Sequence, residues 1–265
     1  MVLNNNIYVF HIRKHNGGGI YLHPFKEFDK IIASGNPFQI EGRYGEEPVI
    51  ESLTAFRSEL YRIIEDSVNN WVNESKFIPR FLISALVFLV AYFFFSFAIR
   101  DPVPMIDEII LGVISAVVCY VLLGRKYRKT TTASKLRAHY RGVVDRIVFS
   151  KSNFVMALET FLIQINGKDI EDVIQNSSDY NELIEMTSDE NIEERNQFLL
   201  YIERLLKKQL SGYQRRLVNK IMMSLYKNAS LIKGLDLISL TSEVDINLFI
   251  AYLLLRQKSS NKTVY

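Results

Sequence analysis

Two long uncharged runs in the middle of the chain limit most strongly what it can fold into. The first, Phe81 to Ile99, has nineteen residues without a formal charge, and the second, Ile109 to Gly124, has sixteen. As a helix the first run is about 28 Å long, close to the hydrocarbon thickness of a bilayer, about 30 Å. Extending the second run back to Pro104 gives it a comparable length. We therefore predict two membrane-spanning helices, at about residues 81–99 and 105–123.

A short connector and the basic residues around the two spans set their orientation. Residues 100–104 are too few to hold a domain, and the two prolines among them end one helix and begin the next. The opposite ends of the spans carry the residues that we expect at the membrane interface: Lys76, Arg80, Arg125, Lys126, Arg128 and Lys129. The positive-inside rule then places both termini in the cytoplasm, and we expect a bacterial inner membrane.

The alternative is a helical hairpin buried inside a water-soluble protein. The outer face of such a helix needs polar residues, and the run from Phe81 to Ile99 offers only Ser84 and Ser96. Its aromatic residues cluster toward the connector, where aromatic side chains anchor helices at an interface. The membrane interpretation is therefore favoured. A polar N-terminus without an apolar core also indicates that no signal peptide is cleaved.

Small residues in the second span predict close helix packing. Gly112, Ser115, Ala116 and Cys119 follow a small-xxx-small spacing. Packing of the two spans on each other is the favoured interpretation, and oligomerisation is the alternative. Because Cys119 is the only cysteine, we expect no intramolecular disulfide and no multi-thiolate metal site.

The residues before the membrane block predict a small β-rich cap, residues 1–47. Residues 7–26 indicate a β-hairpin around the turn Gly17–Gly19, and residues 37–40 are a further strand-like piece. A two-stranded hairpin is marginal alone, so the cap must pack on other parts of the chain. The glycines could also cradle a phosphate, but they lack the Lys-Ser/Thr ending of a P-loop, so a plain turn is favoured.

Two histidines of this hairpin are weak candidates for a metal site. His11 and His23 could lie opposite each other across the strands, with Glu27 or Asp29 as a further ligand. The sequence does not determine the strand register, and ordinary packed or surface histidines are the favoured interpretation. We therefore expect neither a metal nor a cofactor.

Helical periodicity flanks the membrane block on both sides. Residues 48–78 predict an amphipathic helix, and Pro79 predicts a kink or restart. Its apolar stripe is heptad-like: Val49, Leu53, Phe56, Leu60 and Ile63. After a shift of one residue, Val68 and Trp71 continue this stripe. The basic segment 125–160 carries a similar stripe through Leu136, Tyr140 and Ile147. We predict that the two helices pair antiparallel as a cytoplasmic stalk. The alternative is that each stripe faces its own local domain.

Residues 161–258 predict a cytoplasmic helical bundle, followed by a disordered tail at 259–265. Asn166-Gly167 indicates a helix C-terminal cap. Ser242 with Asp245 resembles a capping box before Ile246–Leu255, an apolar run too short to span a bilayer and therefore predicted as a core helix.

Charged residues of the bundle have two interpretations each. Residues 190–210 predict a helix with this apolar stripe: Phe198, Tyr201, Ile202, Leu205 and Leu206. The acids at its start, Asp189, Glu190, Glu193 and Glu194, are explained by the helix dipole. A basic stretch follows, with Lys207, Lys208, Arg215, Arg216 and Lys220. It predicts either a lipid- or partner-binding surface or, as favoured, the solvated face of a bundle helix.

Taken together, these patterns predict a mainly α membrane protein: a two-pass transmembrane hairpin, an N-terminal β-rich cap, a helical stalk and a C-terminal bundle. The sequence holds no zinc-protease, nucleophile-elbow, Walker or dinucleotide motif. The leading hypothesis is a membrane-anchored interaction or assembly protein with a protein partner or its own copies, and no nucleic acid. An oligomeric pore or transport component gated by its cytoplasmic region is the alternative. A membrane-bound enzyme with its site at the histidine hairpin is a third.

Overall fold

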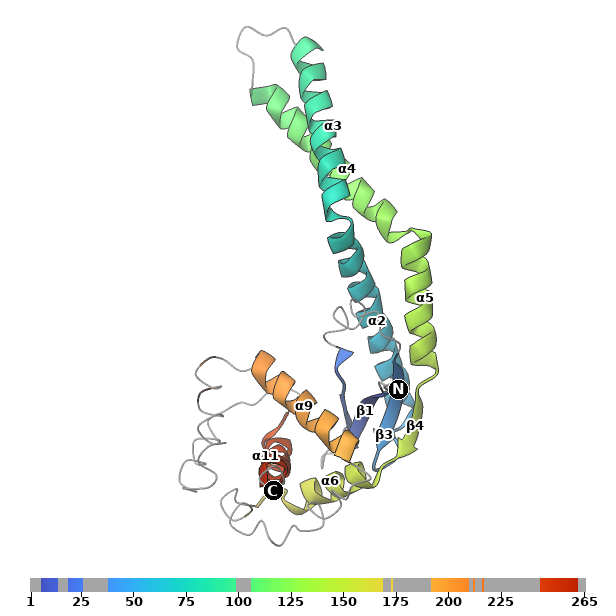
Figure 1. Ribbon diagram of the computed structural model, residues 1–265, viewed down its shortest axis with the longest axis vertical. Coiled ribbons are helices and arrows are strands. Elements are labelled where there is room, and N and C mark those ends of the chain that lie inside the picture. Colours follow the sequence, from blue (N-terminus) through green and yellow to red (C-terminus); the bar gives the residue numbers. More distant parts are fainter. Residues whose placement is uncertain are drawn as a thin grey trace. The chain divides into compact units, whose positions relative to one another are not determined.

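The computed structural model describes residues 6–13, 19–25, 38–98, 106–168, 173, 192–209, 212, 216 and 244–261. This part of the chain is mostly helical with one small mixed sheet (Figure 1). The chain divides into two compact units. Unit 1 comprises residues 1–24, 37–56 and 146–265, and unit 2 comprises residues 25–36 and 57–145.

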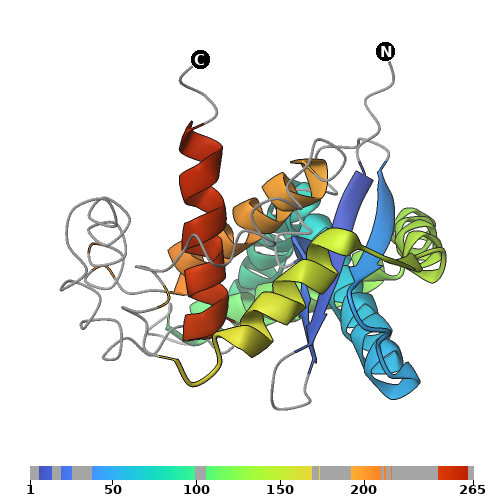
Figure 2. The same ribbon diagram turned by 90° about the horizontal axis from the view of Figure 1, so that it is seen from below.

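The sheet of unit 1 joins strands from distant parts of the sequence. Its order is β2-β1-β3-β4; Figure 2 shows the strands of residues 6–44 in shades of blue. The strands are β1 (Asn6–Arg13), β2 (Gly19–Leu22), β3 (Gln39–Tyr44) and β4 (Val148–Lys151). The pair β1–β2 is antiparallel, which confirms the predicted hairpin, whereas β1–β3 and β3–β4 are parallel. Parallel neighbours need a crossover connection, and the one between β3 and β4 contains the four described helices α2 to α5, within residues 50–145.

Strand β4 corrects the prediction that a helix continues through Ile147. The helix there ends at Asp145, and Val148 then pairs with Glu41 of β3. Phe149 lies directly over Gly42 of β3, where an added Cβ would overlap its ring. Because Gly42 has no side chain, the Phe149 ring can lie over it, although the two residues are far apart in sequence.

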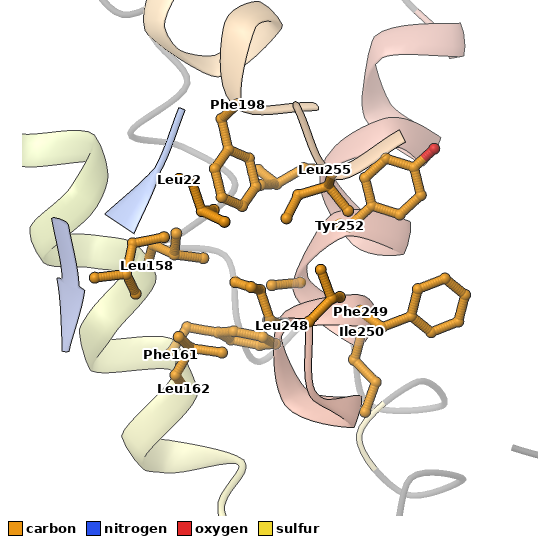
Figure 3. Close-up of a cluster of buried hydrophobic side chains, with 14 of the residues drawn as sticks. Leu22, Leu158, Phe161, Leu162, Phe198, Leu248, Phe249, Ile250, Tyr252 and Leu255 are labelled. Carbon is orange, nitrogen blue, oxygen red and sulfur yellow. The ribbon is translucent and has the colours of Figure 1, made fainter. Parts of the chain in front are cut away.

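Helices α6 (Asn153–Gln164) and α9 (Ile192–Gln209) cover one face of this sheet, and α11 (Ile246–Asn261) packs on these two helices (Figure 2). Figure 3 shows side chains from α6, α9, α11 and β2 meeting in a single hydrophobic cluster. The predicted apolar stripe of α9 is confirmed, because all five of its residues are buried. The predicted core helix at 246–255 is also confirmed, since every residue from Leu248 to Leu255 is buried.

The ends of these helices show which capping predictions were right. Helix α6 ends at Gln164 with Ile165 as its C-cap, and Gly167, two residues further, has a φ of 75°. The helix therefore ends where predicted, but the cap residue is Ile165 rather than Asn166 or Gly167. At α11 the N-cap is Asp245, whose Oδ1 accepts from the Leu248 N–H at 2.9 Å. The predicted box had Ser242 in that role, and Ser242 lies outside the described residues. Helix α11 also continues to Asn261, so the predicted tail from residue 259 begins too early.

The predicted division between an N-terminal cap and a C-terminal bundle differs from the observed units. Side chains of β1 and β2 share one hydrophobic core with α6, α9 and α11. On the other face of the sheet, Tyr21 stacks on Phe56 of the first turns of α2, with ring centroids 4.2 Å apart. Residues 6–13, 19–22 and 38–56 thus belong to the same compact unit as α6, α9 and α11.

Unit 2 is helical in the part that the structure describes. After Arg57 it contains the rest of α2 (Ile50–Ser75), then α3 (Phe77–Ala98), α4 (Ile106–Arg128) and α5 (Thr131–Asp145). Helix α2 ends four residues before Pro79, because proline lacks the N–H that would bond to the Ser75 carbonyl. This agrees with the restart predicted there. The helices α3 and α4 are both long and apolar enough to cross a membrane.

Polar contacts hold α2 and α5 together. The Arg137 guanidinium bonds to the Glu65 carboxylate at 2.9 Å and to Asn69 Oδ1 at 2.8 Å. Tyr61 also donates to the Asp145 carboxylate.

The buried stripe of α2 has steps of four: Phe56, Leu60, Ile64, Val68 and Val72. This corrects the heptad-like stripe, since Ile64 replaces Ile63 and Val49 lies exposed before the helix.

Candidate functional site

An open groove of about 470 Å³ lies on unit 2 where α2 gives way to α3, beside the last turns of α4. Helix α2 contributes Asn73 and Glu74, helix α3 contributes Phe77 and Arg80, and helix α4 contributes Tyr120 and Arg128. The break at Lys76 separates the first two pairs. The groove therefore combines two guanidinium groups, one carboxylate, one amide and two aromatic rings.

Arg80 is the most buried of these residues, with 6% of its surface exposed. Its guanidinium carbon lies 4.0 Å from the centroid of the Tyr120 ring, a cation–π distance. Nη2 donates to the Tyr120 carbonyl at 3.2 Å, and Nη1 donates to Asn73 Oδ1 at 3.1 Å. A Cβ added to Gly124 would come within 2.5 Å of Nη2, so a side chain there would displace the guanidinium. The buried Nε has no hydrogen-bond partner.

Arg128 is exposed and approaches the same amide. Its Nη2 donates to Asn73 Oδ1 at 3.4 Å, so two guanidinium groups share one neutral oxygen. Within the described part of the chain, neither arginine has a carboxylate at ion-pair distance. Glu74 lines the groove but bonds to neither. Two cations beside one neutral acceptor make a locally positive site that an anion can neutralise.

The residues predicted at the membrane interface fall into two groups. Lys76, Arg125, Lys126, Arg128 and Lys129 are exposed, as expected for side chains that reach water or headgroups. Arg80 is different, because it is buried against Tyr120. Sequence reasoning missed this, since Arg80 was counted among flanking charges. The sequence feature that could have indicated this contact is Gly124, because a glycine at the end of an apolar run leaves space for a large side chain of another helix.

The small residues of α4 lie on the side that faces α3. Gly112 is buried, and a Cβ there would lie 3.0 Å from the ring of Phe88. Ser115, Ala116 and Cys119 are partly buried. The close approach at Gly112 is therefore made within one chain.

The strand register does not place the two candidate histidines opposite each other. His11 pairs with Tyr21, and their ring centroids are 4.9 Å apart. His23 follows the end of β2, and its ring lies 5.6 Å from that of Phe56. Glu27 and Asp29 lie outside the described residues, as do Gly17 and Gly18. In the described ranges no three His, Cys, Asp or Glu side chains gather as a metal site would require.

A second polar cluster lies in unit 1, and its arginine is paired with carboxylates. The Arg43 guanidinium contacts Glu194 at 2.5 Å, Glu41 at 2.6 Å and Ser150 Oγ at 2.5 Å. Glu194 also accepts from Ser152 Oγ at 2.6 Å. Burial lowers the pKa of Arg43, but the two carboxylates more than offset this and leave it raised. Because these contacts join β3, β4 and α9, the earlier explanation of Glu194 by the helix dipole alone was incomplete.

The basic stretch after α9 is only partly described. Lys207 and Lys208 lie in the last turn of α9, and Lys207 pairs with Glu203 at 2.7 Å. Arg216 is described as a single helical residue, whereas Arg215 and Lys220 lie outside the described residues. The predicted lipid- or partner-binding surface at these five residues stays a prediction.

Comparisons with protein-family models, with curated proteins and with solved structures give no match for this chain. Its function must therefore be argued from its own residues, and the groove at Arg80 and the apolar faces of α3 and α4 are the features that bear most on it.

Proposed function

We propose that this chain is a membrane-anchored interaction or assembly protein. In this proposal α3 and α4 cross the bilayer, and unit 1 lies in the cytoplasm, where it binds a protein partner or further copies of the chain.

The observation that carries the proposal is the exposure of apolar side chains on both long helices. Only 11% of each helix's most apolar eighteen-residue window is buried. Large side chains such as Phe94 and Phe97 of α3 and Ile114 of α4 are more than half exposed. Water-soluble monomers rarely present continuous apolar patches of this size. A bilayer offers such helices an apolar solvent, and a helix satisfies its own backbone hydrogen bonds there.

The distribution of charge supports the cytoplasmic location. The basic residues lie at one end of the helix pair, around Lys76 and in the last turn of α4. The first turn of α4 instead carries Asp107 and Glu108. The positive-inside rule places the basic end, and with it both flanking regions, in the cytoplasm.

The connectivity supports a role in holding unit 1 at the membrane. The segment between the neighbouring strands β3 and β4 contains α3 and α4. Unit 1 is thus tied to the hairpin through two chain connections rather than one. We infer that this double attachment keeps an interaction module close to the bilayer, where its partners need to be recruited.

Two measurements test the proposal on the full chain. Membrane fractionation should recover the chain in an alkali-resistant membrane pellet, and tags at the two ends should both be accessible only from the cytoplasm. A photo-crosslinking residue at the exposed Leu200 of α9 should then capture a protein in native membranes, whereas one at Phe94 should yield lipid adducts. A chain that stays in the soluble fraction, or termini on opposite faces, would overturn the proposal.

The alternative of a pore or transport component depends on contacts between subunits through the small-residue face of α4. Gly112 instead packs on Phe88 of the same chain. No specific observation favours that alternative, so we keep a single proposal.

A further inference from the structure

We propose that the groove at Arg80 binds the phosphate group of an anionic phospholipid, with Arg80 and Arg128 as its two cationic contacts. This inference rests on the proposed membrane location and goes beyond it, because it assigns a ligand class to one site.

The first argument is unbalanced charge. Arg80 is buried, and its guanidinium meets an aromatic ring, a backbone carbonyl and a neutral amide, none of which carries a negative charge. Arg128 reaches the same amide oxygen. Burying a cation without an anion is costly, and bringing a second cation to it raises that cost. A phosphate between the two groups would remove the imbalance.

The second argument is that Arg80 is held in place before any ligand arrives. Stacking on Tyr120 and the bonds to Asn73 and the Tyr120 carbonyl use two of its five N–H groups. A guanidinium that is already positioned loses little conformational entropy on binding. Its planar fork also matches two phosphate oxygens better than an ammonium does.

The third argument distinguishes a lipid from a free anion. Phe77 lines the groove and is 52% exposed, and its ring stacks on Phe81 with centroids 6.2 Å apart. The apolar surface of α3 continues from these two rings. A cationic groove that opens onto an apolar helix face fits a headgroup phosphate followed by acyl chains, whereas free phosphate gains nothing from the rings.

The fourth argument concerns the charge of the phosphate. The exposed Glu74 carboxylate lines the same groove. The two guanidinium groups and this carboxylate together carry a net charge of +1, which one singly charged phosphodiester neutralises, whereas a doubly charged phosphomonoester would leave an excess negative charge that is costly to desolvate. The site should therefore prefer phosphatidylglycerol over phosphatidic acid, and both over zwitterionic phosphatidylcholine.

The test uses the purified full chain in a neutral detergent. Trp71, the single tryptophan, lies on α2 two residues before Asn73 and serves as a fluorescence probe. The chain is titrated with short-chain phosphatidylglycerol, phosphatidic acid, phosphatidylcholine and inorganic phosphate. We expect saturable binding that is tightest for phosphatidylglycerol and absent for phosphatidylcholine.

Matched variants locate the binding. Arg128→Gln removes an exposed groove cation without disturbing the core and should weaken phosphatidylglycerol binding about tenfold, the loss expected for one charge-assisted hydrogen bond. Arg125→Gln removes an exposed cation outside the groove lining and should leave affinity unchanged. Glu74→Gln should narrow the preference for phosphatidylglycerol over phosphatidic acid.

Three results would overturn this inference. They are equal weakening by Arg128→Gln and Arg125→Gln, no saturable phosphatidylglycerol binding, and binding of inorganic phosphate as tight as that of the lipid. None of these three results depends on whether the chain is recovered in the membrane fraction. A chain recovered in membranes with no effect of Arg128→Gln would sink the lipid site alone, whereas a freely soluble chain would sink the proposed function.

Discussion

Helices α11 and α3 are both rich in uncharged apolar residues, yet their surroundings are opposite. In unit 1 every side chain of α11 from Leu248 to Leu255 is buried by protein. In α3, by contrast, Val90 is 62% exposed and Phe94 66% exposed. The comparison shows that an apolar composition requires a helix to be shielded from water, but it does not determine whether protein or lipid shields it. The uncharged run Ile246–Leu255 of α11 reaches only about 15 Å, half a bilayer, so it must be covered by protein, whereas α3 is long enough for lipid to cover it.

The charged groups of the two units differ in the same way. Arg43 of unit 1 meets two carboxylates, so its charge is balanced within the chain. Arg80 of unit 2 meets only neutral or aromatic groups. The charge of Arg43 is therefore balanced by carboxylates of its own unit, whereas Arg80 has no carboxylate at ion-pair distance among the described residues.

The largest effect should come from truncating a core residue of α11. Phe249 is fully buried, so Phe249→Ala should lower the free energy of unfolding of unit 1 by about 3–5 kcal/mol. Hydrogen exchange of the α11 amides in the detergent-solubilised chain measures this. The matched control is Phe94→Ala of α3, which should leave α11 exchange unchanged. Equal protection of α11 in wild type and Phe249→Ala would contradict the burial described here.

The second-largest effect is expected from a charge placed on the exposed surface of α3. Val90→Asp places a charge near the middle of the span, which should cost about 2.5–3.5 kcal/mol of insertion free energy. The fraction of chain integrated into membrane vesicles during synthesis reports this cost. Leu200→Asp, on the exposed side of α9, is the control and should insert as wild type does. If both variants inserted equally well, lipid could not be the solvent of α3.

A smaller effect is expected where α3 and α4 touch. Gly112→Val adds a branched side chain against Phe88, and such overpacking typically costs about 1–3 kcal/mol. The thermal unfolding midpoint of the detergent-solubilised chain should fall. Val113→Leu, at the neighbouring exposed position, should leave it unchanged. A loss of oligomers at constant midpoint would instead assign the small-residue face to contacts between copies.

The smallest effect is a pH dependence confined to unit 1. Burial lowers the pKa of His11, so the folded state keeps this imidazole neutral where the unfolded chain would protonate it. The unfolded state then binds more protons, and stability is lost as pH falls below the ordinary value of 6.5 toward the lowered pKa. His11→Gln should flatten this part of the stability–pH curve of unit 1. Identical curves for His11→Gln and wild type would refute the assignment.

The sequence alone determined the features whose causes are local. The length of the two uncharged runs predicted α3 and α4, because a helix needs about twenty apolar residues to cross a bilayer. The spacing of Phe198, Tyr201 and Leu205 predicted the buried side of α9, since helical periodicity places them on one face. Pro79 and Gly167 predicted a helix break and a helix end through backbone geometry, which needs no distant partner.

Only the tertiary structure decided the features that depend on residues far apart in the chain. Val148 to Lys151 form a strand because β3 lies beside them, and no local pattern reveals that neighbour. Strand register separated His11 from His23, and a contact between two helices turned Arg80 from a flanking charge into the buried residue of a groove. The physical reason is the same in each case. Sheet pairing, ion pairs and cation–π contacts form between segments that are distant in the sequence. Helical periodicity and capping depend only on residues that are neighbours along the chain.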